Sequence, residues 1–173
     1  GIDVRGILRA FVKGVTNGLN FDEGASTLTQ QLLKNNVFTN WTNEGKVERF
    51  VRKFQEQFLA LELEETLTAQ GKDAKSVILE NYLNTINLGA GSYGVQAASK
   101  RYFDKDAKDL TLSECAVLAA IPQSPTKYNP ITNPENNAER RATVLDKMLE
   151  QGYITEEAYQ EAMADNVYDR IQE

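Results

Sequence analysis

The chain has 173 residues, a net charge of −6, no histidine and a single cysteine, Cys115. With 41% hydrophobic and 25% charged residues, we expect one folded domain over residues 1–173 rather than a disordered chain. The absence of histidine excludes His-based catalytic triads and His zinc sites, and the single cysteine excludes an internal disulfide.

The charges are unevenly distributed along the chain. Residues 1–60 contain 8 Lys or Arg and 6 Asp or Glu, whereas residues 61–173 contain 11 and 19. General nucleic-acid binding requires a strongly basic face, so we expect no nucleic-acid partner. We expect an anionic ligand to bind within the first sixty residues, where positive charge is in excess.

The first three predicted elements are helices. Apolar residues repeat at helical spacing from Ile7 to Leu19, and Asp3 is placed to cap this helix. A second helix is expected to start at Ser26 or Thr27 and to run toward Asn35, followed by a loop over residues 36–45. The third helix carries one apolar stripe, which contains Val47, Phe50, Val51, Phe54, Phe58 and Leu61.

The rest of the chain is also predicted to be helical. Helices are expected at about residues 73–86, 94–103, 111–121, 135–151 and 155–165. Thr111 and Glu114 have capping-box spacing, and Gly152 is a helix stop. Four prolines between residues 122 and 134 indicate one long irregular loop. No segment reads as a convincing strand, so the predicted fold class is mainly α.

A glycine-rich segment gives a weaker signal. Gly89, Gly91 and Gly94 fit the G-x-G-x-x-G pattern of dinucleotide-binding proteins. That pattern requires a preceding strand, whereas residues 76–84 have a helical pattern. We therefore expect a sharp turn between helices rather than a cofactor site.

The segment Gly24–Asn35 is rich in hydroxyl and amide side chains and opens a helix. Thr27, Gln31 and Lys34 share one face of that helix, with Gln30 beside them. A helix N-terminus favours anions, so this segment is a candidate anion or sugar site. The alternative is that the hydroxyls only cap the helix and the amides and lysine only cover its surface.

A second candidate segment lies on the third predicted helix. Arg52, Lys53 and Glu56 are neighbours at helical spacing. They indicate either a cationic clamp for phosphate around a carboxylate, or a solvated helix face with ordinary ion pairs.

These segments together resemble the family 51 glycosyltransferases, the peptidoglycan polymerase domains of class A penicillin-binding proteins and of monofunctional transglycosylases. Gly24–Asn35 matches the family motif G-x-S-T-I/L-T-Q-Q-L-x-K-N, and Arg52–Glu56 matches R-K-x-x-E. Lys75–Asn84 is similar to I-L-E-x-Y-L-N, and Arg140–Leu145 matches R-R-x-x-V-L. The motifs occur in the family's order over most of the chain.

The resemblance implies a lysozyme-like, mostly helical fold and the polymerisation of lipid II. In that reaction the 4-hydroxyl of an incoming lipid II displaces the lipid pyrophosphate of the growing glycan. The anomeric configuration inverts and a β-1,4 bond forms. The family's general base is a glutamate in an upstream E-D-x-x-F-x-x-H-x-G motif, whose last glycine Gly1 resembles. We therefore expect a domain truncated at its N-terminus that binds lipid II but polymerises it poorly.

The resemblance also implies roles for single residues. Glu56 matches a second family glutamate, implied to be catalytic by assisting at the pyrophosphate, directly or through a divalent cation. Lys34 matches the lysine that binds pyrophosphate. A further family arginine falls at Glu48, and whether the adjacent Arg49 replaces it is open. The expected substrate-binding residues are Ser26, Thr27, Gln30, Gln31, Lys34, Asn35, Arg49, Arg52 and Lys53.

The implied partners are lipid II, the growing lipid-linked glycan and a membrane surface. No cofactor is expected to be required, although Mg²⁺ or Mn²⁺ is allowed at the pyrophosphate, with Glu56 as the candidate protein ligand. The segment Val37–Trp41 either touches lipid headgroups or packs as an ordinary loop. Tyr82, with Glu80 and Asn84, is expected to form a scaffold behind the site. The expected location is the extracytoplasmic face of a bacterial cell membrane, within a longer anchored chain.

Two other functions fit parts of the sequence. A lysozyme-like peptidoglycan hydrolase or lytic transglycosylase would share the fold but would use carboxylates alone, without a lysine and arginine cluster. A non-catalytic helical interaction module would leave the polar start of the second helix unexplained.

Overall fold

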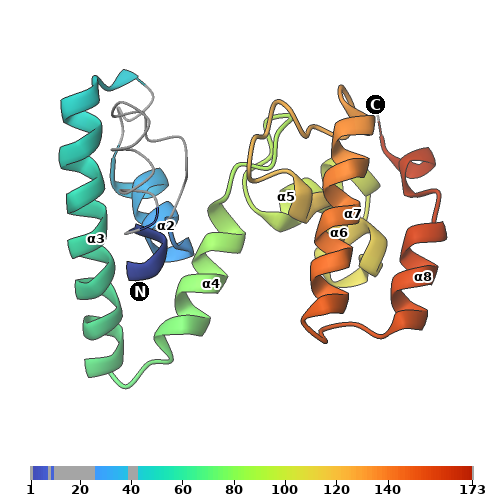
Figure 1. Cartoon of the computed structure of the whole chain (residues 1–173). Helices are drawn as coiled ribbons and strands as arrows, with labels where there is room; N and C mark the ends of the chain where they lie inside the picture. Colours follow the sequence, from blue (N-terminus) through green and yellow to red (C-terminus); the bar gives the residue numbers. More distant parts are fainter. Residues whose placement is uncertain (1, 8, 10–25, 39–42, 173) are drawn as a thin grey trace. The chain divides into compact units, whose positions relative to one another are not determined.

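The computed structural model describes residues 2–7, 9, 26–38 and 43–172 (Figure 1). The chain divides into two compact units, Gly1–Tyr82 and Leu83–Glu173. Helices make up most of the described residues, and among these no strand is found beyond one isolated bridge between Asn87 and Tyr93. None of the described helices is long and apolar enough to cross a membrane.

The first unit is built around α2 (Leu28–Val37) and the long α3 (Lys46–Ala69), and α4 (Ala74–Thr85) begins in it. The α2 and α3 helices pack on each other. Thr29 Oγ1 donates a 2.8 Å hydrogen bond from α2 to Glu64 Oε1 on α3. Ala60 is fully buried. These contacts fix the two helices that carry the candidate site.

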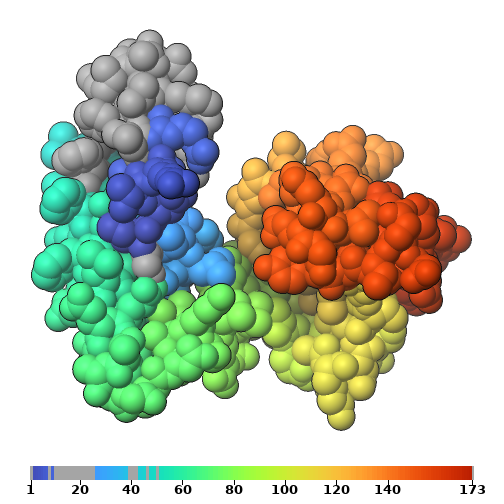
Figure 2. All heavy atoms as spheres, turned by 60° about the horizontal axis from the view of Figure 1, so that its bottom comes forward, coloured from blue at the N-terminus to red at the C-terminus, as the bar shows by residue number. Residues whose placement is uncertain are grey.

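The inner face of α3 is partly charged. Among the α3 residues whose burial the structure describes, the buried ones are Arg52, Glu56, Ala60 and Leu67, which recur at helical spacing on one side. The described members of the apolar stripe lie on the opposite side and are exposed, with Phe54 at 70% and Phe58 at 67%. Figure 2 shows α3 at the surface of its unit. An amphipathic helix normally buries its apolar stripe, so α3 departs from the usual pattern because charged partners occupy its inner face.

The second unit consists of short helices around α7 (Pro134–Glu150). The others are α5 (Val95–Phe103), η2 (Ala107–Asp109), α6 (Leu112–Ala120), α8 (Glu156–Ala164) and η3 (Val167–Arg170). Ala116, Leu145 and Ala162 form a buried cluster that joins α6, α7 and α8. Small residues on two of these helices allow close approach to Leu145, which is fully buried.

A buried carboxylate ties the elements of this unit together. Glu114 is fully buried at the start of α6 and accepts hydrogen bonds from Thr111 N, Lys105 Nζ and Arg170 Nε. Burial alone raises the pKa of Glu114, but these donors outweigh it and the net pKa is lowered. The capping box predicted for this helix is therefore also the anchor for two cations.

The glycine segment forms a tight turn before α5, as predicted. Gly94 has φ +82°, and a Cβ there would lie 2.4 Å from the carbonyl oxygen of Asn84. Helix α4 precedes the segment, and only the isolated bridge is found where a dinucleotide site would need a strand. The glycine therefore serves a close backbone approach.

The helix predictions agree closely with the structure. The five helices expected after residue 70 are α4 to α8, each within one residue at both ends. Asp3 accepts a hydrogen bond from Gly6 N at 2.8 Å, as expected of a cap. Most of the helix predicted from Ile7 to Leu19 lies outside the described residues, as do residues 39–42 of the predicted loop. The α2 helix continues two residues beyond Asn35, and the short helices η2 and η3 were not predicted.

Candidate functional site

The start of α2 is closed by a reciprocal cap between Thr27 and Gln30. Gln30 N donates to Thr27 Oγ1 at 3.4 Å, and Thr27 N donates to Gln30 Oε1 at 2.8 Å. Gln30 is only 2% exposed because its side chain folds back over the first turn. Capping thus uses two side chains that were also predicted to bind substrate, and that second role stays a prediction.

The charged side chains of α3 gather around Glu56. Arg52 Nη1 donates to Glu56 Oε1, and Lys53 Nζ donates to Glu56 Oε2 at 3.1 Å. The Glu56 side chain is fully buried and that of Arg52 is 7% exposed, whereas that of Lys53 is 41% exposed. Both oxygens of Glu56 are therefore bound to cations, and of these two cations Lys53 is the one that solvent reaches.

Hydrogen bonds connect this group to the start of α2 and to α4. Lys53 Nζ donates to Ser26 Oγ at 2.7 Å. Gln31 Nε2 donates to the Ser26 carbonyl at 3.4 Å, and Tyr82 OH donates to Gln31 Oε1 at 3.2 Å. Burial raises the pKa of the Tyr82 hydroxyl, so it remains a neutral donor at pH 7. The structure therefore brings three helices of the first unit together at this site.

Lys34 belongs to the same electrostatic cluster. Burial lowers the pKa of its ammonium group, the charges of Lys53 and Arg52 lower it further, and Glu56 opposes them. An anion beside Lys34 would offset both the desolvation and the repulsion of its ammonium group, so this position is suited to bind one. We call Lys34, Arg52, Lys53 and Glu56 the α2–α3 charge cluster.

Other predicted residues are exposed or make different contacts. Asn35 and Arg49 are exposed on the surfaces of α2 and α3. Glu48 accepts a hydrogen bond from Gly45 N at 2.9 Å and so caps α3. Of the residues predicted to form the scaffold, Tyr82 contacts the site, whereas Glu80 is exposed.

Two carboxylates near the site were not predicted. Glu64 accepts from Thr29 Oγ1, and both oxygens of Glu44 accept from Arg52 Nε. Glu44 lies in a loop without periodicity, so the sequence offered no signal for it. Glu64 is on α3, but the capping role suggested for the hydroxyls gave no reason to pair it with Thr29.

The described residues do not by themselves fit a divalent-cation site. No group of three or more Asp, Glu, His or Cys side chains among them is arranged to hold a metal ion. Glu56, the candidate ligand, already has both oxygens bound to Arg52 and Lys53. A divalent cation there would take most of its ligands from phosphate oxygens of a substrate.

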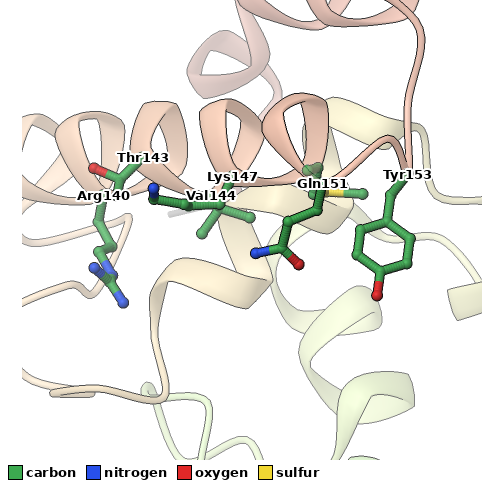
Figure 3. Close-up of a pocket in the computed structure, with 7 residues that line it drawn as sticks. Arg140, Thr143, Val144, Lys147, Gln151 and Tyr153 are labelled. Carbon is green, nitrogen blue, oxygen red and sulfur yellow. The ribbon is translucent and has the colours of Figure 1, made fainter.

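A separate hollow of about 400 Å³ lies on α7 in the second unit (Figure 3). Arg140, Val144, Lys147, Met148 and Tyr153 are among its lining residues. Lys147 is paired with Glu150, and Arg140 Nε has no hydrogen-bond partner among the described residues. The hollow contains none of the predicted site residues, so the α2–α3 charge cluster remains the candidate site.

Comparison with known proteins agrees with the motifs. The chain matches the transglycosylase family over residues 1–149. It is 44% identical over 173 residues to penicillin-binding protein 1A of Clostridium acetobutylicum, a match that covers 95% of this chain and 20% of that protein. It is 45% identical over 155 residues to penicillin-binding protein 1F of Bacillus subtilis, covering 90% of this chain and 20% of that protein.

A crystal structure of penicillin-binding protein 1A from Haemophilus influenzae is also similar. The match has a TM-score of 0.52 and 41% identity, and it covers 56% of this chain and 14% of that one. The mainly α, lysozyme-like fold expected from the sequence is therefore confirmed.

The chain belongs to the transglycosylase family. It spans about a fifth of the length of the curated relatives it matches.

Proposed function

We propose that this chain is a peptidoglycan glycosyltransferase domain whose α2–α3 charge cluster binds the pyrophosphate of lipid II and of the growing lipid-linked glycan. The observation that carries the proposal is the position of three cations, Lys34, Arg52 and Lys53, around one buried carboxylate, Glu56. The membership of the chain in the transglycosylase family supports it.

A pyrophosphate leaving group explains why the α2–α3 charge cluster has three cations and only one carboxylate. When the incoming 4-hydroxyl displaces the lipid pyrophosphate, negative charge develops on the departing oxygens. Cations held in place before the reaction stabilise that charge without a reorganisation cost. Lys34 is half-buried and Lys53 is 41% exposed in its side chain, so these two are the cations we assign to the ligand.

Arg52 and Glu56 have a different part in this proposal. The Arg52 side chain is 7% exposed and the Glu56 side chain is fully buried, so neither presents much surface to a ligand. Glu56 holds Lys53 through Oε2, and Ser26 holds the same ammonium through Oγ at 2.7 Å. We infer that Glu56 assists at the pyrophosphate by fixing the direction of Lys53.

We further propose that the domain works at a membrane surface, on its extracytoplasmic face and within a longer anchored chain. Lipid II is itself a lipid, so its pyrophosphate lies at the level of the headgroups. The exposed apolar face of α3 (Val47, Val51, Phe54, Phe58 and Leu61) supports contact with such a surface. Val37, from the segment predicted to touch headgroups, is 56% exposed, while residues 39–42 lie outside the described part.

The experiment that tests the proposal compares ligands with and without the pyrophosphate. Lipid II and the matching disaccharide peptide without lipid or pyrophosphate are titrated against the chain in detergent. A third titration uses inorganic pyrophosphate. We expect lipid II and pyrophosphate to compete for one site and the disaccharide peptide to bind far more weakly.

The other two functions predict different results. A peptidoglycan hydrolase would bind the glycan without pyrophosphate and would release fragments from purified cell-wall sacculi. An interaction module would bind none of the three ligands. Either result would overturn the proposal.

A further inference from the structure

The loop before α3 places a second carboxylate against Arg52. Both oxygens of Glu44 accept from Arg52 Nε, at 2.6 and 2.8 Å. The Glu44 side chain is 13% exposed and that of Arg52 is 7% exposed. The contact is therefore largely shielded from water, where a charge-assisted hydrogen bond is stronger than at a surface.

Glu44 and Glu56 hold the same guanidinium at different nitrogens. Glu44 binds Nε, and Glu56 binds Nη1. Because a guanidinium is planar and its donors are fixed relative to each other, two carboxylates on separate nitrogens set the plane and direction of the group. Glu44 approaches from a loop and Glu56 from the helix itself, so the pair also ties that loop to α3.

We propose that Glu44 is a positioning residue for the anion site. It fixes Arg52, Arg52 fixes Glu56, and Glu56 with Ser26 fixes the ammonium of Lys53. The inference deepens the proposed function and rests on it, because the ligand assigned to Lys53 is pyrophosphate. This series of contacts gives a reason for a second carboxylate, Glu44, in a site that binds an anion.

The sign of one measurement separates positioning from a simple effect of charge. Removal of a negative side chain near an anion site strengthens anion binding if only the electrostatic field matters. Removal of a positioning residue weakens binding, because Arg52 and then Lys53 lose their fixed directions. The two explanations therefore predict opposite changes at Glu44.

The experiment uses Glu44→Ala and Glu44→Gln, with Glu62→Gln as the matched control. Glu62 is an exposed carboxylate on α3, so its variant loses the same charge without touching the cluster. Inorganic pyrophosphate is titrated against each protein. We expect about tenfold weaker binding for Glu44→Ala, equivalent to about 1.4 kcal/mol. Glu44→Gln keeps one acceptor oxygen and is expected to fall between Glu44→Ala and the unmodified chain.

A second readout follows Arg52 directly. The Nε–H signal of Arg52 is observed by NMR and assigned by its loss in Arg52→Lys. We expect slow solvent exchange of this proton in the unmodified chain and in Glu62→Gln, and fast exchange in Glu44→Ala. Glu44→Gln is used alone if Glu44→Ala fails to fold.

The outcomes separate this inference from the proposed function. Unchanged or tighter pyrophosphate binding by the Glu44 variants, or an Nε–H that stays protected in them, would overturn the positioning role. If the unmodified chain does not bind pyrophosphate, the proposed function fails, and the exchange of Nε–H alone decides whether Glu44 fixes Arg52.

Discussion

The replacement Glu56→Gln tests how much the α2–α3 charge cluster contributes to folding. Glu56 is fully buried and binds two cations, so its loss leaves positive charge at a site shielded from water. Breaking a buried ion pair typically costs about 3–5 kcal/mol. Two features of the structure reduce that cost. Arg52 keeps Glu44 as a partner, and Lys53 can turn to solvent, where an ion pair contributes about 0–1 kcal/mol.

We therefore expect Glu56→Gln to lower the free energy of unfolding by about 2–3 kcal/mol, as for loss of a hydrogen bond to a charged group. In urea, with a slope of about 2 kcal/mol per M, the midpoint should fall by roughly 1–1.5 M. Circular dichroism measures the transition, and Glu62→Gln is the control, expected within about 0.5 kcal/mol of the unmodified chain. A loss below about 0.5 kcal/mol for Glu56→Gln would refute the reasoning, since a buried carboxylate with two cations would then contribute nothing.

Three further predictions follow from the geometry. Because burial and the charges of Lys53 and Arg52 lower the pKa of Lys34, the folded chain releases this proton at lower pH than the unfolded chain does. Lys34 should therefore make the free energy of unfolding rise with pH between its lowered pKa and its ordinary pKa of 10.5. The affinity for pyrophosphate should fall over the same pH range, and an affinity that holds up to pH 10.5 would contradict this. Gly94→Ala should destabilise the second unit by about 1–3 kcal/mol in thermal unfolding, because its Cβ would meet the Asn84 carbonyl at positive φ. The control is Gly152→Ala, which shares a positive φ but meets no atom of the described residues within 4 Å, and equal losses for both would show that the close approach costs nothing. Removal of divalent cations with EDTA should leave the affinity for pyrophosphate within about twofold in a titration, since lysines supply the charge; a loss above about tenfold would mean that a cation completes the site.

The helices could be predicted from local signals. Neighbouring residues alone set the helix caps at Thr27, Thr111 and Thr155 and the helix stop at Gly152, so the local sequence is enough to predict where these helices begin or end. The orientation of α3 could not be predicted in this way. Its apolar stripe suggested a buried face, but Arg52 and Glu56 take that place because they satisfy each other's charge.

The exposure of Cys115 could not be predicted from the sequence either. It lies in an apolar run of α6, a setting in which a free cysteine is usually buried, but the structure exposes it. That helix has apolar or small residues on all sides, so periodicity does not indicate which face is buried.

The cluster itself could be predicted only in part. The spacing of Arg52, Lys53 and Glu56 indicated one helix face, and the motif resemblance linked that face to Lys34. Glu44 could not be found, because its contact with Arg52 depends on the path of the loop that brings it there. The contact of Tyr82 with Gln31 spans 51 positions and likewise depends on tertiary packing.

The most direct test of the central claim is the binding of lipid II in detergent by the unmodified chain and by Lys34→Ala. Lys72→Ala is the control, because it removes an exposed lysine beyond the C-terminal end of α3. We predict that Lys34→Ala weakens binding by about tenfold or more while Lys72→Ala leaves it within about twofold. Equal binding by all three proteins would contradict the assignment of the pyrophosphate to the α2–α3 charge cluster.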